Sequence, residues 1–404
     1  MSTSLLYHAF GIRGYQYRRT DYQGGQTIFT IHQELKTCLC SACGSTAVRP
    51  RGTVERSFRA VPIGRRSTVI VLPIPRVECR DCGVVRQVKI PFADPRRSYT
   101  QSFERYVLEL SRRMTIRDVA IHLGVSWDTI KDIQKRDLAR RFAKPKLKHL
   151  RHIAIDEISI AKGHRYLTVV MDLESGAVVF VGDGKGAKAL QPFWKRLRAS
   201  KAKVEAVAMD MSPAYREAVS THLPKAKIVF DRFHVMKLFN EKLSDLRRAL
   251  QREATDVMQK KVLKGTRWLL LKAAENLDEG RDEKKRLEEA LALNQSLAAA
   301  YYLKEDLRQF WEQPGKTFAT LFLAGWIKRA EASGIKVLQQ MAKALAAHRG
   351  GLLAYYDAMI TSGPMEGTNN KIKTMKRQAY GFRDREFFKL KILGIHETRY
   401  ALVG

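Results

Sequence analysis

The sequence predicts an α+β protein of several domains, in which a small cysteine-rich module and a helical module precede an α/β domain that a long helical segment interrupts. Three observations lead to this prediction. All five cysteines lie between residues 38 and 82, helical apolar spacing follows at residues 102–131, and short apolar runs typical of buried strands begin at residue 152. With 404 residues, 45% of them hydrophobic, the chain is long enough for two or three domains with ample cores.

The chain carries a large excess of positive charge. Its 73 lysines and arginines against 41 acidic residues give a formal net charge of +32. This excess is far beyond what solubility requires and predicts a polyanionic partner, with nucleic acid as the leading candidate and a membrane surface as the alternative. The sequence has neither an apolar run long enough to span a bilayer nor a secretory signal or lipidation motif. We therefore expect a cytoplasmic protein with no membrane partner.

Four of the cysteines form two CxxC pairs, Cys40 with Cys43 and Cys79 with Cys82, and a glycine follows each pair. Glycine lets the chain turn tightly around a metal, and four thiolates in two such pairs suit tetrahedral Zn²⁺. The residues between the two pairs are predicted to form β structure, which would allow the two cysteine pairs to meet. We expect a zinc-ribbon-like finger with a structural zinc, and the alternative is a set of reduced or redox-active thiols. Cys38 is the spare thiol and could replace Cys40 as a ligand.

A helix-turn-helix pattern follows the finger. Apolar residues recur at helical spacing from Ile116 to Leu123, Gly124 makes the turn, and Ser126 caps a second helix. In such a motif the second helix enters the major groove of DNA. Its exposed residues are Trp127, Asp128, Thr129 and Lys131. Arginines are dense in the finger and would contact the DNA backbone, among them Arg51, Arg65 and Arg66.

From residue 149 the pattern changes to α/β. Three strands joined by tight turns should be antiparallel, and a strand–helix–strand unit follows them. The expected strands span residues 152–160, 166–173, 177–182, 204–209 and 226–230, with a crossover helix at 190–197. This order is that of a ribonuclease H-like fold, in which the first strand lies centrally beside the fourth.

Two acidic residues come together in this arrangement. Asp156 lies in the first strand and Asp210 ends the fourth, so the fold should bring them side by side. A close pair of carboxylates is costly unless a cation neutralises it, and Mg²⁺ or Mn²⁺ prefers such oxygen ligands and serves phosphoryl transfer. Asp231 ends the fifth strand. Either strand-end aspartate taken alone could instead be an ordinary helix N-cap.

Glu366 is the candidate for a third carboxylate. It falls in the first turn of a helix that Gly363 and Pro364 begin. Asn370 and Arg377 follow near the same helix face, at spacings of about four and seven residues, and are candidates for supporting roles. The alternative is that Glu366 merely complements the helix dipole.

The segment between Asp231 and Glu366 contains no convincing strand. Several stretches in it have helical apolar spacing, so we expect an all-helical insertion into the α/β domain. Three tryptophans in it could stack an unpaired base of a nucleic acid, or could belong to the packed helical core. These are Trp268, Trp311 and Trp326.

Together these motifs resemble the ISL3 family of bacterial insertion-sequence DDE transposases. The resemblance rests on AIDE at Asp156, MDMSPAYREA at Asp210, FDRFHV at Asp231 and GPMEGTNNKIKTMKRQAYGFRD at Glu366, with the CSAC and CRDC finger and the helix-turn-helix before them. It covers essentially the whole chain. The resemblance implies that Asp156, Asp210 and Glu366 form the catalytic DDE triad and hold its metal ions. Asp231 and His234 resemble an Asp-x-x-His signature shared with Mutator- and hAT-type transposases, which implies a supporting role in the active site.

The resemblance also implies a function. The finger and the helix-turn-helix would bind the terminal inverted repeats of the element, while the core would cut phosphodiesters with metal-activated water and join a 3′-hydroxyl to target DNA. We expect double-stranded DNA as the partner, a homodimer on paired ends and association with the nucleoid. Two other classes remain open: a non-catalytic DNA-binding regulator, and a ribonuclease H-like nuclease or resolvase that does not join ends.

The predicted domain boundaries follow from these motifs and from a basic linker at residues 144–148. We expect the finger at residues 1–95 and the helix-turn-helix with its linker at 96–148. The ribonuclease H-like catalytic core should begin at 149–231, be interrupted by the helical insertion at 232–360, and end with its final helices at 361–404.

Overall fold

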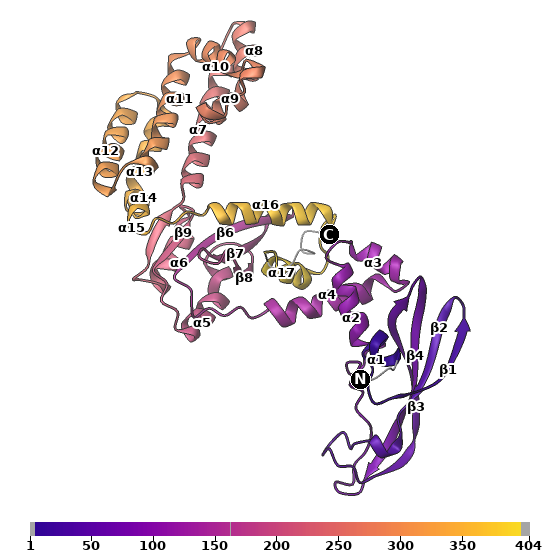
Figure 1. The fold of residues 1–404 in the computed structure, drawn as a ribbon. Coiled ribbons are helices and arrows are strands. Elements are labelled where there is room, and N and C mark those ends of the chain that lie inside the picture. Colours follow the sequence, from indigo (N-terminus) through magenta and orange to yellow (C-terminus); the bar gives the residue numbers. More distant parts are fainter. Residues whose placement is uncertain (1–4, 162, 397–404) are drawn as a thin grey trace. The chain divides into compact units, whose positions relative to one another are not determined.

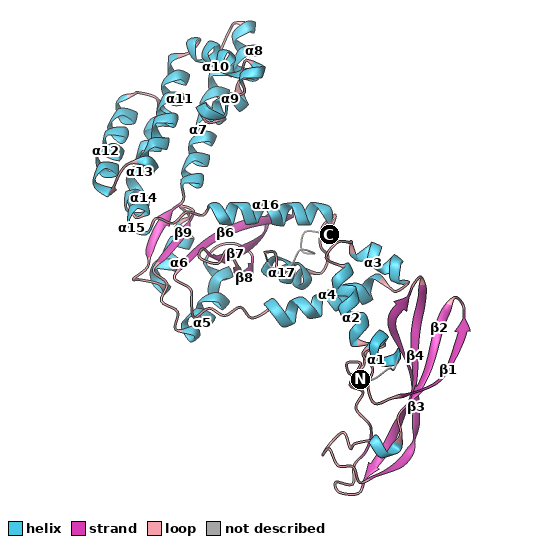
Figure 2. Ribbon diagram, in the orientation of Figure 1, coloured by secondary structure: helices cyan, strands magenta, loops and turns pink. Residues whose placement is uncertain are grey.

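The computed structural model describes residues 5–161 and 163–396 (Figure 1). The chain divides into two compact units. One comprises the residues up to 143 together with those from 374 onward, and the other comprises residues 144–373. Each unit contains one sheet, and helices make up most of the remainder (Figure 2). Within the described ranges, no helix is long and apolar enough to cross a membrane.

The N-terminal sheet follows helix α1 (Leu5–Phe10) and supports the cysteine pairs. Its spatial order is β1-β2-β4-β3, with β5 paired to β4. The strands are β1 (Gln16–Gln23), β2 (Gln26–His32), β3 (Val48–Ile63), β4 (Arg66–Cys79) and β5 (Val85–Gln87). Alternate residues of β4 are buried, including Ile70, Leu72 and Ile74, as expected for a strand with one face on a core. The β3–β4 hairpin is the β excursion that the sequence predicts between the cysteine pairs.

The helix-turn-helix consists of α2 (Gln101–Leu110), α3 (Ile116–Leu123) and α4 (Trp127–Phe142). The predicted turn is confirmed, because Gly124 has a positive φ of 59° and ends α3 in the left-handed conformation that glycine adopts most easily. The predicted cap is also confirmed, since the Ser126 hydroxyl accepts a hydrogen bond from the Thr129 amide at 3.2 Å. Helix α4 continues well beyond the predicted motif, to Phe142.

Helix α17 (Arg385–Leu393) packs against α4, and both belong to the first unit. Phe387 and Leu390 share one hydrophobic cluster with Leu138 and Phe142. This differs from the expectation that all of residues 361–404 belong with the catalytic core, because the chain from residue 374 onward groups with the N-terminal unit. An apolar stripe on a short helix requires an apolar surface to cover it, but the stripe does not specify which surface.

The second unit contains a sheet in the order β10-β9-β6-β7-β8. Its elements are β6 (His152–Ala161), β7 (Arg165–Asp172), β8 (Val178–Asp183), α5 (Gln191–Ser200), β9 (Ala206–Met209), α6 (Pro213–His222) and β10 (Lys227–Phe230). Strand β6 pairs antiparallel with β7 and parallel with β9, so the first strand is central and lies beside the fourth. The predicted ribonuclease H-like fold and its five strands are confirmed.

A helical insertion separates β10 from helix α16 (Gly363–Gln378), and Figure 1 shows α7 leading from the sheet into it. Its helices are α7 (Arg232–Glu253), α8 (Val257–Gly265), α9 (Arg267–Leu271), α10 (Glu283–Ala292), α11 (Gln295–Arg308), α12 (Lys316–Ala332), α13 (Lys336–Ala347), α14 (Arg349–Leu353) and α15 (Tyr355–Ala358). One hydrophobic cluster runs from the sheet into these helices, so the insertion and the sheet share a core.

The three tryptophans of the insertion differ in exposure. Trp326 is fully buried, and its indole N–H donates to the Leu303 carbonyl at 2.9 Å. Trp311 is 8% exposed and belongs to the same cluster. These two are core residues, so the alternative of helix packing holds for them. Trp268 is 66% exposed, with the Arg267 guanidinium 4.8 Å from its ring centroid.

Candidate active site and metal centre

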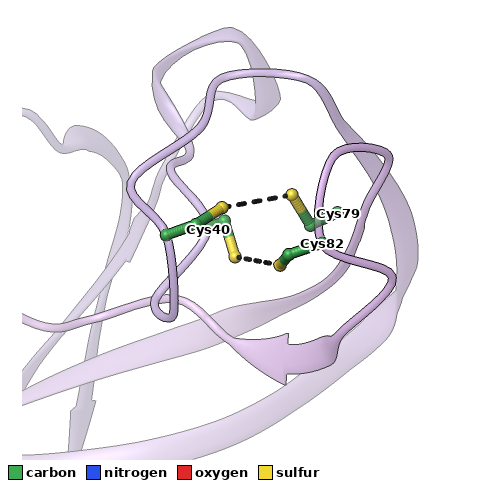
Figure 3. A group of neighbouring side chains, drawn as sticks. Cys40, Cys79 and Cys82 are labelled. Atoms are coloured by element: carbon green, nitrogen blue, oxygen red, sulfur yellow. Dashed lines mark hydrogen bonds between the residues drawn. The ribbon is translucent and has the colours of Figure 1, made fainter.

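The four paired cysteines form a compact cluster at the end of the β3–β4 hairpin (Figure 3). Their sulfur atoms all lie within 4.8 Å of one another; Cys40 Sγ is 3.7 Å from Cys82 Sγ, and Cys43 Sγ is 3.5 Å from Cys79 Sγ. A tetrahedron with Zn–S bonds of about 2.3 Å has sulfur–sulfur edges of about 3.8 Å. The spacing and the ligand type therefore fit a structural Zn²⁺ ion.

Backbone amides in the turns favour the thiolate form of these ligands. Amide donors from Cys43 and Ala42 lower the pKa of Cys40 to about 6, and the Ala42 amide lies 3.4 Å from the Cys40 sulfur. Cys38 lies outside the cluster. It is fully buried, its thiol donates to the Glu34 carbonyl at 3.5 Å, and burial raises its pKa. Cys40 and not Cys38 thus belongs to the metal cluster.

Asp156 and Asp210 lie at matching positions of two neighbouring parallel strands. Ile155 of β6 pairs with Met209 of β9, Asp156 is the next residue within β6, and Asp210 directly follows the end of β9. Burial is the main cause that raises the pKa of Asp156 above its ordinary value, and the negative charge of Asp210 adds to the effect while His234 opposes it. The fold therefore brings the two predicted aspartates together, as the strand order implied.

Helix α16 reaches this site through Asn369. Its side-chain amide donates to Asp156 Oδ2 at 2.7 Å, and Asn369 is only 6% exposed. Glu366 is half-buried and precedes Asn369 by three residues, which places both on one helix face. Asn370, the neighbour that the sequence suggested, is exposed. Arg377 is also exposed and lies in the part of α16 that groups with the first unit.

Asp231 connects the starts of two helices. Its side chain caps α7 by accepting from the Phe233 amide at 3.1 Å, and its other oxygen accepts from the Ser362 amide at 3.1 Å, just before α16. The N-cap alternative is thus correct for Asp231. It is not correct for Asp210, because Ser212 is the cap residue of α6 and Asp210 Oδ1 accepts from the Ser212 amide at 3.0 Å.

His234 lies between two of the aspartates. Its Nδ1 is 3.5 Å from Asp231 Oδ2 and its Nε2 is 3.8 Å from Asp156 Oδ1. Burial lowers the pKa of His234, but the hydrogen bond to Asp231 and the charges of Asp156, Asp231 and Asp210 outweigh it, and the net pKa is raised. The neighbouring carboxylates thus favour the protonated form of His234.

The donor set at the strand ends fits a hard divalent cation. Carboxylate oxygens are the ligands that Mg²⁺ and Mn²⁺ prefer, and the amide oxygen Oδ1 of Asn369 is buried without a hydrogen-bond partner next to Asp156. Among the residues that the structure describes, the four cysteines are nevertheless the only group of three or more cysteine, histidine or acidic side chains whose ligand atoms cluster closely enough for one ion. Asp156, Asp210 and Glu366 together do not form such a closed group.

A cleft of about 780 Å³ runs along α7 from Asp231, and Asp156, Asp210 and Glu366 are not among the residues that line it. Asp231, Thr361 and Gly363 line one part of it. Apolar side chains contribute to its wall, namely Phe233, Met236 and Leu271, and basic side chains flank them, namely Arg232, Lys237, Arg248, Arg267 and Arg308. Arginines beside an apolar wall suit a nucleic-acid strand, because the phosphates need positive charge and the sugars and bases need apolar contact.

Most of the predicted DNA-contacting residues are exposed, but the prediction is wrong for Lys131, whose side chain is only 19% exposed. Trp127 is 48% exposed, and the Lys131 ammonium lies 5.2 Å from its ring centroid and 3.4 Å from Asp128 Oδ1. Thr129 is half-buried beside the helix cap. In the finger, Arg65 and Arg66 are exposed at the turn of the β3–β4 hairpin, while Arg51 forms an ion pair with Glu78 at 2.5 Å.

A zinc ribbon, a helix-turn-helix and a ribonuclease H-like domain with paired carboxylates define a DNA transposase, and family comparisons agree. Residues 153–392 match a transposase family model, residues 88–138 match the helix-turn-helix domain of transposase family ISL3, and residues 36–82 match the zinc finger of the transposases of IS204, IS1001, IS1096 and IS1165. The chain belongs to the ISL3 family of transposases.

Two insertion-sequence transposases support this placement. The chain is 32% identical over 398 residues to the transposase of insertion sequence IS1001 from Bordetella parapertussis, covering 97% of this chain and 98% of that protein. It is 29% identical over 393 residues to the transposase of IS1557 from Mycobacterium tuberculosis, covering 90% and 87%. Among solved structures, a Drosophila P element transposase strand transfer complex matches 74% of this chain and 92% of that chain, at 10% identity and a TM-score of 0.42.

Proposed function

We propose that this transposase cuts and joins DNA with Mg²⁺ or Mn²⁺ held by Asp156, Asp210 and Glu366. The observation that carries the proposal is the parallel pairing of Ile155 with Met209, because Asp156 and Asp210 are the residues that follow this pair in the sequence. The Asn369 hydrogen bond to Asp156 adds support, because it ties the helix that carries Glu366 to the same place.

Side chains around the three carboxylates would orient them and limit their mutual repulsion. When bound, the metal supplies an activated water or 3′-hydroxyl and stabilises the leaving oxygen. Asn369 holds Asp156 in one orientation, and Asp231 fixes the start of α16 through the Ser362 amide. When protonated, His234 would limit the repulsion between the carboxylates in the absence of a cation, because its Nε2 lies 3.8 Å from Asp156 Oδ1. The basic cleft along α7 offers a path by which a DNA strand reaches these groups.

The first unit would recognise the ends of the element. Trp127, Asp128, Thr129 and Lys131 begin the second helix of the motif, the position from which such helices contact base edges. Arg65 and Arg66 would contact phosphates from the tip of the hairpin. Arg51 is already paired with Glu78 and would contribute less. Because two element ends must be brought together, we expect a homodimer on paired terminal repeats.

The test is metal-dependent cleavage of DNA that carries an end of the chain's own element. Asp210→Asn should lower the cleavage rate by about a thousandfold or more, since a lost metal ligand removes several kcal/mol of transition-state stabilisation. Asp278→Asn, a change at an exposed aspartate of the helical insertion whose carboxylate pairs with Arg281, is the matched control and should cleave normally. Cleavage by Asp210→Asn at the wild-type rate would refute the assignment.

The same assay separates the other two classes. A non-catalytic regulator would bind the ends but would not cleave them at any Mg²⁺ concentration. A nuclease or resolvase would cleave them but would not join a precleaved 3′-end to target DNA. We expect this protein to do both, and to lose both activities together in Asp210→Asn.

A further inference from the structure

A groove of about 840 Å³ lies in the first unit, between the helix-turn-helix and the segment that follows α16. One side consists of residues at the starts of α3 and α4, namely Thr115, Ile116, Arg117, Trp127 and Lys131. The other side consists of residues 378–384 with Phe387 and Lys391. The groove thus joins two parts of the chain that are far apart in sequence, and it includes Trp127 and Lys131 of the proposed recognition helix.

Tyr380, on the second side, is unusual in both exposure and backbone. Its side chain is fully exposed, and its φ is +50°. The conformation is a helix C-cap, in which the Tyr380 amide donates to the Arg377 carbonyl at 3.1 Å and the Gly381 amide donates to the Lys376 carbonyl at 2.9 Å. Glycine or asparagine adopts this conformation at lower cost. A large aromatic residue here gains little packing within the unit, so its position is explained better by an external contact.

The segment that carries Tyr380 is firmly attached to the recognition helix. The Lys135 ammonium, on α4, lies 3.1 Å from Asp384 and 2.7 Å from Glu386. Asp384 also caps α17 by accepting from the Phe387 amide at 3.0 Å. Residues 380–383 therefore have a fixed place relative to α4, which is what a shared binding surface requires.

The charges around the groove favour an anionic occupant. Asp384 and Glu386, acidic residues on this segment, share the Lys135 ammonium, which offsets one of their two negative charges. Arg117 and Arg383 are exposed on opposite sides, with Lys131 between them in the lining. Guanidinium groups together with exposed aromatic rings match the phosphates and sugar faces of a DNA backbone.

We propose that Tyr380 and Arg383 contact the DNA backbone of the terminal repeat beside the recognition helix. The end-binding surface is then completed by the C-terminal segment of the chain. The inference rests on the proposed role of α4, because a duplex held by Trp127 and Lys131 must pass the opening of the groove that these two residues line. Truncation after the helix-turn-helix would remove one side of the binding surface.

The test uses full-length, zinc-loaded protein and the equilibrium binding of a duplex that carries the terminal repeat of its own element, measured by fluorescence anisotropy at several salt concentrations. Arg383→Gln should weaken binding about tenfold and reduce the slope of log K against log salt by about one, the value for one lost phosphate contact. Arg112→Gln, a change at a 54% exposed arginine paired with Glu109 in the same unit, is the matched control and should leave both values unchanged.

Tyr380→Gly separates a contact from a folding effect. Glycine relieves the strained backbone, so the variant should unfold at the same temperature as the wild type or a higher one, yet bind about tenfold more weakly. Tyr380→Phe keeps the ring and should bind within about twofold of wild type. Tyr302→Ala, at a tyrosine that is 61% exposed in the helical insertion, controls for loss of an exposed ring.

Trp127→Ala and Lys131→Gln test the proposed role of α4 separately from the proposed role of the groove. If these variants lose binding while Tyr380→Gly and Arg383→Gln bind as wild type, the groove inference is wrong and the role of α4 stands. If Trp127→Ala and Lys131→Gln bind normally, the proposed role of α4 fails, and weakened binding by Tyr380→Gly and Arg383→Gln would still support the groove. Should Tyr380→Gly prove unstable, Arg383→Gln and its salt slope decide the matter.

Discussion

The cysteine cluster and the carboxylate site both collect anionic ligands, but they are assembled in different ways. The cysteines come from two tight turns at one end of a hairpin, and their four sulfur atoms lie within 4.8 Å of one another. The carboxylates come from two strands and a helix, and three other residues connect these elements, namely Asn369, Asp231 and His234. The first site is compact enough to enclose one ion, whereas the second is open, as the proposed access of a DNA strand would require.

Loss of one cysteine should therefore have the largest effect on folding. Cys79→Ala removes the ligand at the end of β4, so we expect zinc content to fall to near zero and the finger to lose its fixed structure. End binding should fall with it, because the finger and helix-turn-helix belong to one unit. Metal analysis and far-UV circular dichroism with and without a chelator would measure this. Retention of one tightly bound zinc by the variant would contradict a four-cysteine site.

Asn369→Ala should have the next largest effect, and it should act on catalysis alone. The change removes the 2.7 Å hydrogen bond that orients Asp156, and loss of such a supporting contact costs about 10- to 100-fold in activity. Its neighbour Asn370 is exposed and provides the control, since Asn370→Ala should cleave within about threefold of wild type. Both variants should bind the terminal repeat normally. Equal losses of cleavage rate in the two variants would show that the hydrogen bond from Asn369 to Asp156 is not the cause of the effect.

The pKa of His234 predicts a smaller, pH-dependent effect on stability. Because its folded-state pKa is raised, protonated His234 stabilises the fold below its ordinary pKa near 6.5, and this contribution disappears as pH rises through the folded-state value. Without added metal, His234→Gln should therefore lower the unfolding temperature by a few degrees at pH 6 and by progressively less above pH 7. A difference that grows with pH would have the wrong sign for this interpretation.

The comparison also shows which features the sequence could predict. The cysteine pairs, the Gly124 turn and the Ser126 cap are local, because each is set by residues a few positions apart. The pairing of Asp156 with Asp210 spans a long stretch of chain, but strand order fixes it once the ribonuclease H-like pattern is recognised. The start of the helix that carries Glu366 was also predictable, because Gly363 and Pro364 mark it.

The features that the sequence did not predict depend on how a helix is rotated about its axis and on which surface it packs against. Asn369 and Asn370 flank the same stripe of α16, and only the packed helix decides which one faces Asp156. The attachment of α17 to α4 depends on Lys135 and Asp384, which are 249 positions apart, and no strand pattern connects them. In the helical insertion, Trp326 and Trp268 look alike in sequence, and only packing separates the buried one from the exposed one.

Substitution of Cys38 should have the smallest effect, and it tests most directly which four cysteines form the metal site. It lies two residues from Cys40, yet its thiol is buried in the hydrophobic cluster of the sheet and donates to the Glu34 carbonyl. Cys38→Ala should therefore keep one zinc and normal end binding, and should lower the free energy of unfolding by only about 1 kcal/mol, the usual cost of a small change in a core. Zinc stoichiometry and a chemical denaturation curve would measure both. If Cys38→Ala lost zinc while Cys40→Ala kept it, the ligand set would shift by one cysteine and the geometry of the turn would have to change with it.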